Sequence, residues 1–168
     1  METLTGWTGN GGHAPRFPVF KLENDDWKDG LVVRTPNWLG DAVMALPALV
    51  QLRRTLPRNC ALFVLTIPQL HDFYNSIPMV DLTVCLHRAH ALWNRADINT
   101  VKALRAGCAA MLNNSLRDAL FFRLAGVRKL FGAAARGRGF LLTRSCQFPK
   151  RRDFVLNNLH HADRYLSI

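Results

Sequence analysis

The chain has 168 residues, a formal net charge of +10 and a hydrophobic content of 49%. These values exclude a disordered chain and suit one domain with a core large enough to fold unaided. The basic balance predicts an anionic partner, which is nucleic acid, a membrane surface or a phosphorylated substrate, and it does not choose among them.

The cysteine spacing and the lengths of the apolar runs argue against disulfide-linked, zinc-binding, membrane-spanning and secreted proteins. No C-x-x-C pair occurs, so free thiols in a reducing compartment are expected rather than disulfides or zinc. No apolar run approaches the ~18 residues of a membrane span, and the start of the chain lacks the pattern of a signal peptide. We therefore expect a cytoplasmic protein that is able to touch a membrane from that side. The cysteines are Cys60, Cys85, Cys108 and Cys146.

Residues 1–29 are rich in Gly, Thr, Asn and Pro and are predicted to be a flexible N-terminal extension before an ordered domain at 30–168. A strand at 31–33 follows, and then a loop at 34–40 in which Gly40 is expected to turn tightly. Asp41 stands where a helix begins. Two interpretations stay open at this point: a helix N-cap, or a general base at the carboxyl edge of a sheet.

Apolar runs and helical periodicity alternate through the rest of the chain. Pro47 suits the first turn of a helix that Pro57 stops, and Ser115 and Gly126 suit the two ends of a later helix. The alternation predicts an α/β fold with a mostly parallel sheet flanked by helices. The other strands are expected at 60–67, 82–86, 109–112 and 127–132, and the other helices at 69–77, 98–105, 116–125 and 154–165, with loops at 87–99 and 145–152.

Several familiar site patterns are absent from the sequence. It has no G-x-G-x-x-G, no Walker loop and no D-x-D pair, so neither a dinucleotide nor a metal–diphosphate site is supported. His160 and His161 are neighbours on a predicted helix, where their side chains diverge by about 100°. They suit solvated or capping histidines better than a metal clamp. No cofactor and no metal are expected.

Basic residues crowd the last third of the chain, and arginine holds phosphate and carboxylate oxygens by paired hydrogen bonds. A solvated basic face is the interpretation favoured for Arg123, Lys129 and Arg144. For the glycine-flanked Arg136 and Arg138, ligand binding and a solvated face stay equally open, because the backbone there can approach a ligand closely.

Three segments in order carry a resemblance, namely residues 34–41, 112–126 and 132–143. They resemble a known family, the ADP-heptose:lipopolysaccharide heptosyltransferases of glycosyltransferase family 9, and most of all its heptosyltransferase II type. Residues 34–41, RTPNWLGD, resemble the family's N-terminal signature. Residues 112–126 are similar to the segment that follows its fourth strand, and residues 132–143 to its basic segment ending in LLT. Residues 160–166, HHADRYL, are similar to the helix that comes next. The resemblance covers about residues 31–168.

The resemblance implies the Rossmann-like, acceptor-side N-terminal domain of a GT-B glycosyltransferase. The reaction would move heptose from ADP-heptose to the lipopolysaccharide inner core with inversion. The resemblance also implies that Asp41 is the general base, and this interpretation is then favoured over the helix N-cap. It also places Asn37, Trp38 and Gly40 near the donor phosphates. The residues that would bind the phosphorylated acceptor are Ser115, Arg117, Arg136 and Arg138.

The family's C-terminal donor-binding domain has no counterpart in this sequence. We therefore expect weak or no activity from these residues alone, and we expect that a separate C-terminal half is a possible partner. Peripheral contact with the inner membrane is a further expectation, and nucleic acid is not an expected partner. The alternatives are a non-catalytic basic module that binds nucleic acid, and a relative that uses another sugar nucleotide.

Overall fold

The computed structural model of the chain describes residues 30–87, 93–146 and 165. The extension predicted at 1–29 and nearly all of the helix predicted at 154–165, with its two histidines, lie outside the described residues. Within them no helix is long and apolar enough to cross a membrane.

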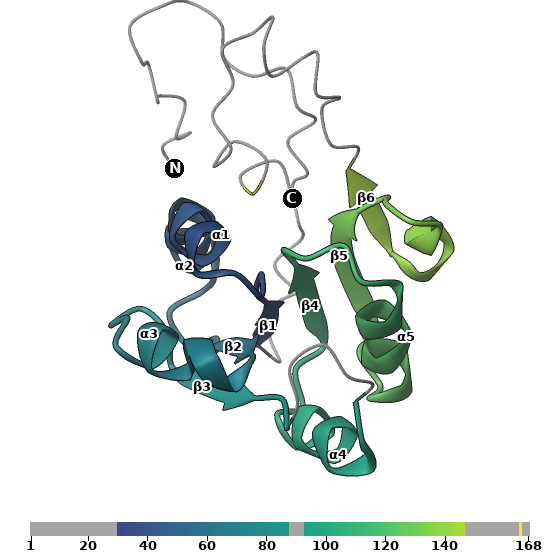
Figure 1. The fold of residues 1–168 in the computed structure, drawn as a ribbon, viewed down its shortest axis with the longest axis horizontal. Coiled ribbons are helices and arrows are strands. Elements are labelled where there is room, and N and C mark those ends of the chain that lie inside the picture. The colour runs from purple at the N-terminus through teal and green to yellow at the C-terminus, as the bar shows by residue number, and fades with distance from the viewer. Residues whose placement is uncertain (1–29, 88–92, 147–164, 166–168) are drawn as a thin grey trace, which may run out of the picture.

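The centre of the fold is a six-stranded sheet in the order β3-β2-β1-β4-β5-β6 (Figure 1). Every neighbouring pair is parallel, which confirms the α/β prediction. The strand order reverses between β1 and β4. The segments that follow these two neighbouring strands therefore lie on either side of this reversal, at the carboxyl edge of the sheet. The strands are β1 Leu31–Arg34, β2 Leu62–Thr66, β3 Leu82–Cys85, β4 Cys108–Met111, β5 Lys129–Ala133 and β6 Arg144–Cys146.

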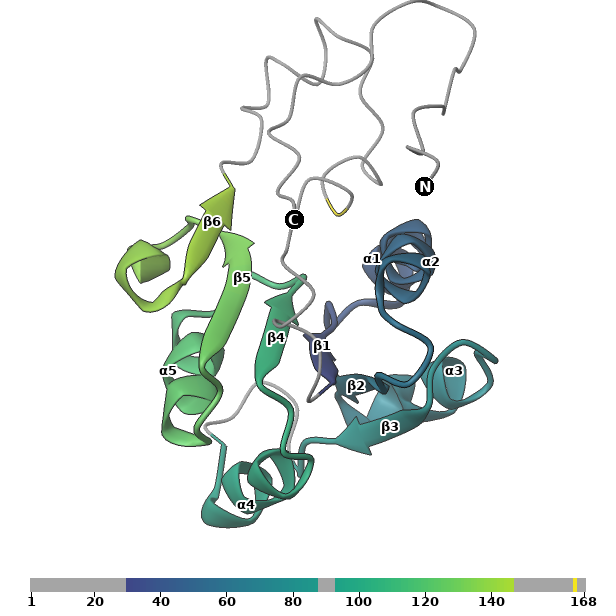
Figure 2. The ribbon, with the colours of Figure 1, turned by 180° about the vertical axis from the view of Figure 1, so that it is seen from behind.

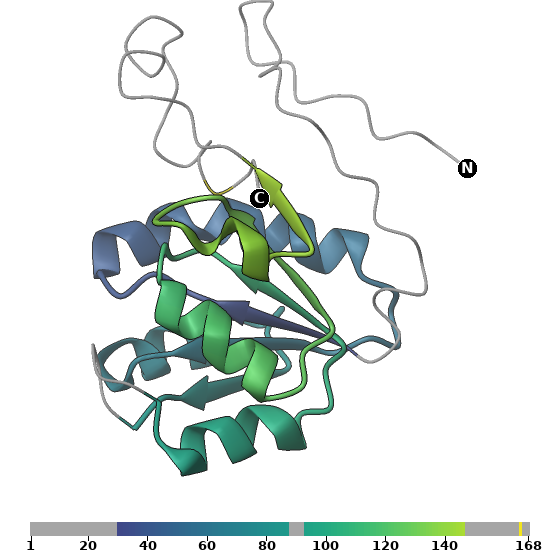
Figure 3. The same cartoon turned by 90° about the vertical axis from the view of Figure 1, so that its right-hand side faces the viewer.

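Helices cover both faces of the sheet (Figures 2 and 3). On one face α1, α2 and α3 form a core with Leu31 and Val33, and on the other α4 and α5 form a second core with Val32. Burial on both faces is why the strands occur as continuous apolar runs. The helices are α1 Leu39–Met44, α2 Leu46–Thr55, α3 His71–Asn75, α4 Arg95–Ala103 and α5 Leu116–Leu124, with 3-10 turns η2 Pro68–Leu70 and η3 Arg138–Leu141.

The start of α4 and the position of β6 differ from the sequence prediction. Helix α4 begins at Arg95 rather than at 98, because Asn94 and Asp97 form a reciprocal capping box with two hydrogen bonds of 2.8 Å. Strand β6 lies partly in the segment predicted as a basic loop. Its three residues carry no apolar pattern, and it exists because it pairs with the end of β5.

Other local predictions are confirmed. Ser115 caps α5, Gly126 adopts a φ of 87° just after that helix, and Pro47 lies in the first turn of α2. Cys60 and Cys108 are buried free thiols, and Cys85 is a half-buried one.

Candidate functional site

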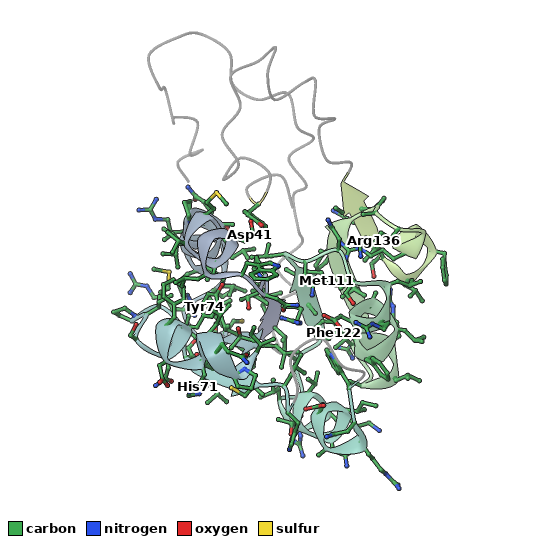
Figure 4. All side chains as sticks on the ribbon, viewed as in Figure 1. Asp41, His71, Tyr74, Met111, Phe122 and Arg136 are labelled. Atoms are coloured by element: carbon green, nitrogen blue, oxygen red, sulfur yellow. The ribbon has the colours of Figure 1, made fainter. Side chains whose placement is uncertain are left out.

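Every site residue predicted from the sequence follows the carboxyl end of β1, β4 or β5. These three strands are adjacent in the sheet, with β1 and β4 on either side of the reversal in strand order. In open parallel sheets, ligands bind outside the carboxyl ends at this reversal. Figure 4 shows Asp41 and Arg136 at the same end of the molecule, with Met111, the last residue of β4, between them in that view. The topology therefore gathers segments that lie far apart in the sequence.

Asp41 is in the first turn of α1 but does not cap it. The N-cap is Trp38, whose extended backbone (φ −110°, ψ 139°) makes the entry to the helix, so the N-cap interpretation of Asp41 is wrong. The expected tight turn at Gly40 is also wrong, because Gly40 is helical and has no positive φ. The half-exposed Asp41 carboxylate makes no hydrogen bond or ion pair with the described residues. It is free to accept a proton from a ligand hydroxyl.

The surface beside Asp41 is open. The Trp38 side chain is 71% exposed and Leu39 is 57% exposed. A Cβ added at Gly40 would meet no heavy atom within 4 Å, so a ligand has room to approach the backbone there. The Asn37 side chain is half-buried next to this opening.

Arg34, the last residue of β1, makes hydrogen bonds to the loop between β1 and α1. Arg34 is 2% exposed, and its guanidinium uses all three nitrogens. Nε donates to Asp118 Oδ2 over 2.8 Å, Nη1 to the Thr35 carbonyl oxygen over 2.7 Å, and Nη2 to Asn37 Oδ1 over 2.8 Å. Burial lowers the pKa of Arg34, and the neighbouring Asp118 charge acts in the opposite direction.

Asp118 connects the β1 loop to the segment after β4. Besides Arg34, it accepts a hydrogen bond of 2.6 Å from Asn113 Nδ2, and its own backbone N–H donates to Ser115 Oγ over 3.1 Å. Sequence reasoning did not include Arg34 or Asp118 among the site residues. One signal was present: an arginine that ends a buried strand requires a buried partner.

Ser115 and Arg117 lie at the first turn of α5. The Ser115 hydroxyl oxygen accepts the capping bond from Asp118, which leaves its proton for another acceptor. Arg117 is exposed at the same helix end.

Arg136 and Arg138 have different environments. Arg136 is exposed on a left-handed backbone with φ 51°. Arg138 is fully buried, and its Nε donates to the Ala133 carbonyl oxygen over 2.7 Å. Gly132 leaves the space for it, since a Cβ there would lie 3.3 Å from Arg138 Nη2. Arg138 therefore lies against the end of β5, while Arg136 is exposed two residues before it. Binding of the acceptor by Arg138 stays a prediction.

Tyr74 of α3 lies beneath the site. Its ring is fully buried, and its hydroxyl makes no hydrogen bond within the described residues. Burial is the main cause of a raised pKa of Tyr74, and the nearby Asp41 carboxylate acts in the same direction. Tyr74 is therefore a neutral phenol near the Asp41 carboxylate at neutral pH.

No metal site is evident in the described part of the chain, where no three His, Cys, Asp or Glu side chains gather.

Comparisons with known proteins show what shares this fold. No protein-family model matches the chain, and no curated protein matches its sequence. The structure of Escherichia coli ADP-heptose LPS heptosyltransferase II matches with a TM-score of 0.67 at 20% identity, over 82% of this chain and 39% of that one. E. coli heptosyltransferase WaaC with ADP matches with a TM-score of 0.62 at 14% identity, over 81% and 44%.

A family 9 glycosyl transferase from Veillonella parvula matches with a TM-score of 0.63 at 15% identity, over 84% of this chain and 41% of that one. The chain thus spans between 39% and 44% of the length of these three structures. The likeness establishes the fold. It confirms, at the level of fold, the resemblance that the sequence motifs indicated.

Proposed function

We propose that these residues form the acceptor-side domain of an inverting glycosyltransferase that moves heptose from ADP-heptose to the phosphorylated inner core of lipopolysaccharide. The observation that carries the proposal is the half-exposed, unbonded Asp41 carboxylate at the reversal in strand order. The fold supports it, because the solved structures that share this fold are named as heptosyltransferases or a glycosyl transferase.

In the proposed reaction Asp41 accepts the proton of an acceptor hydroxyl as the hydroxyl oxygen attacks the anomeric carbon of the donor. The bond from that carbon to the diphosphate breaks, and the electron pair leaves with the diphosphate. Attack from the opposite face inverts the anomeric centre. Asn37, Trp38 and Gly40 lie toward the donor phosphates in this proposal.

The acceptor phosphates meet Arg117 and Arg136 in the proposal, with Ser115 beside them. Arg138 stays a predicted acceptor-binding residue. The sequence resemblance assigns stabilisation of the leaving diphosphate to a second domain, so slow transfer by these residues alone stays an expectation. Rapid multiple turnover by them would contradict that expectation. Action in the cytoplasm is likewise part of the proposal.

Replacing Arg117 and Arg136 together by alanine should weaken binding of a phosphorylated core oligosaccharide by about tenfold or more, because charge-assisted hydrogen bonds are lost. Isothermal titration calorimetry measures the dissociation constant. The matched control is Arg54→Ala with Arg58→Ala, two exposed arginines outside the site.

Single-stranded and duplex DNA serve as competing ligands in the same titration. Binding that is tighter for DNA than for the oligosaccharide, and steep in salt, would support the nucleic-acid alternative instead. Equal binding by the wild type and the double site variant would contradict the acceptor assignment.

We also propose that the outer face of α5 makes the peripheral membrane contact. Leu116, Leu120 and Leu124 are 41%, 47% and 55% exposed, and Phe140 of η3 is 80% exposed. Figure 3 shows η3 beside α5, where Arg123 donates to the Leu141 carbonyl oxygen. Between residues 112 and 146 the one acidic residue is Asp118, which is buried. An apolar surface on a segment whose exposed charges are all basic suits an anionic lipid bilayer.

Leu120→Glu should reduce co-sedimentation with vesicles that contain phosphatidylglycerol by about tenfold, because an apolar contact is lost and a repelled charge is added. The control is Leu82→Glu, which alters an equally exposed leucine on β3 at the other side of the sheet. Unchanged sedimentation of Leu120→Glu, or self-association of the wild type through α5 in place of vesicle binding, would refute this contact.

A further inference from the structure

We infer that the Arg34–Asp118 pair fixes the orientation of the Asn37 side-chain amide. In this orientation Asn37 presents its N–H group, and not its carbonyl oxygen, to an anionic oxygen of a bound ligand. The inference rests on the proposed function and deepens it. It names a ligand-binding group together with the pair of buried residues that positions it.

The first step concerns which end of the Asn37 amide faces Arg34. A guanidinium has only donors, so the atom that it contacts is an acceptor. The 2.8 Å contact from Arg34 Nη2 therefore assigns the near atom as Asn37 Oδ1. Asn37 Nδ2 then points away from Arg34, and it makes no hydrogen bond within the described residues.

The second step concerns why this orientation is held. The other guanidinium nitrogens of Arg34 are occupied by Asp118 Oδ2 and the Thr35 carbonyl oxygen. Arg34 is buried, and Asn113 also donates to the same Asp118 oxygen. The guanidinium therefore cannot turn away. Flipping the Asn37 amide would set donor against donor and forfeit a charge-assisted bond.

The third step concerns the ligand. Asn37 is half-buried beside the open space at Gly40, in the segment that leads to Asp41. A fixed amide donor favours an acceptor oxygen of the ligand over a cation or a donor group. A phosphate oxygen fits this chemistry, whether it belongs to a sugar-nucleotide diphosphate or to a phosphorylated saccharide.

Asn37→Asp tests the inference with little change in shape. Both carboxylate oxygens are acceptors, so the bond to Arg34 is kept, while the outward group changes from a donor to an anionic acceptor. We expect the affinity for a phosphate ligand to fall at least tenfold. The midpoint of urea unfolding should stay the same or rise, because Arg34 gains a carboxylate partner. Asn59→Asp, at an exposed turn before β2, is the control for the same change in net charge.

The probes are ADP and a phosphorylated core oligosaccharide, titrated separately into the full chain and followed by calorimetry. The side-chain amide signal of Asn37 in 15N-labelled protein should shift with the ligand that binds there, which distinguishes the two sources of phosphate. Arg34→Lys keeps the charge but loses the fork. It should alter the Asn37 amide signal and weaken the same ligand, a result that loss of stability alone would not produce.

The inference fails if Asn37→Asp binds both probes as tightly as the wild type, or if the Asn37 amide signal moves with neither of them. The proposed function would still stand in that case, provided that Asp41→Asn abolishes sugar transfer. Conversely, a normal Asp41→Asn rate together with lost phosphate affinity in Asn37→Asp would reject the proposed base and keep the anion contact.

Discussion

Replacing Asp41 by asparagine is expected to slow sugar transfer by about 100- to 10,000-fold, the range that a general base contributes. Asparagine keeps the size of the side chain but cannot accept the proton of the attacking hydroxyl. Because the Asp41 carboxylate makes no hydrogen bond or ion pair with the described residues, the fold should be retained. The measurement is single-turnover transfer from ADP-heptose to a heptose-accepting core oligosaccharide with protein in excess, which records even slow rates.

The matched control is Asp72→Asn, which neutralises an exposed carboxylate on α3. This variant should transfer sugar at the wild-type rate. Acceptor affinity should be similar in both variants, so the loss in Asp41→Asn belongs to the chemical step rather than to binding. A wild-type rate in Asp41→Asn would remove Asp41 from the mechanism and, with it, the observation on which the proposed function depends.

Removing the Asp118 carboxylate is expected to destabilise the fold by about 3–5 kcal/mol, because it leaves the Arg34 charge buried without its partner. Both side chains of the pair are nearly inaccessible, with exposures of 3% and 8%. Asp118→Ala also removes the acceptor of the hydrogen bond from the Asn113 side-chain amide. Urea unfolding monitored by circular dichroism measures the free energy of unfolding of wild type and variant.

Two comparisons isolate the cause. The double variant Arg34→Met with Asp118→Leu removes both charges, and it should recover much of the loss, since an apolar pair of similar volume is tolerated where a lone charge is not. Arg53→Ala breaks the exposed pair with Asp81, where side-chain exposures are 22% and 51%, and should cost about 1 kcal/mol or less. An Asp118→Ala variant as stable as Arg53→Ala would show that the Arg34 charge is solvated or paired elsewhere.

The Arg34–Asp118 ion pair contributes to the stability of the fold, and it also contacts two segments of the candidate site. Arg34 ends β1 and contacts Asn37 in the loop before α1, while Asp118 is in the first turn of α5 and contacts Asn113 after β4. One ion pair therefore joins the two segments on either side of the reversal in strand order. The double variant should regain stability without regaining the orientation of Asn37, which separates the two roles.

Much of the fold could be predicted from local sequence. Five strands were recognised because burial on both faces demands uninterrupted apolar runs, and the ends of α5 because Ser115 and Gly126 have strong positional preferences. Strand β6 and the start of α4 were missed. The first depends on pairing with β5, and the second on a polar capping box without apolar periodicity.

The sequence by itself determined the α/β alternation, the buried strands and the segments in which a site was sought, because short-range periodicity and special backbone residues carry that information. Only the tertiary structure decided which of these side chains are buried and which are exposed. It buried Arg138 behind Gly132, left Arg136 outside, moved Asp41 off the helix cap and paired Arg34 with Asp118, 84 positions away. The physical reason is that Arg34 and Asp118 meet only because β1 and β4 are neighbours in the sheet. The order of the strands depends on the packing of the whole sheet and not on local sequence.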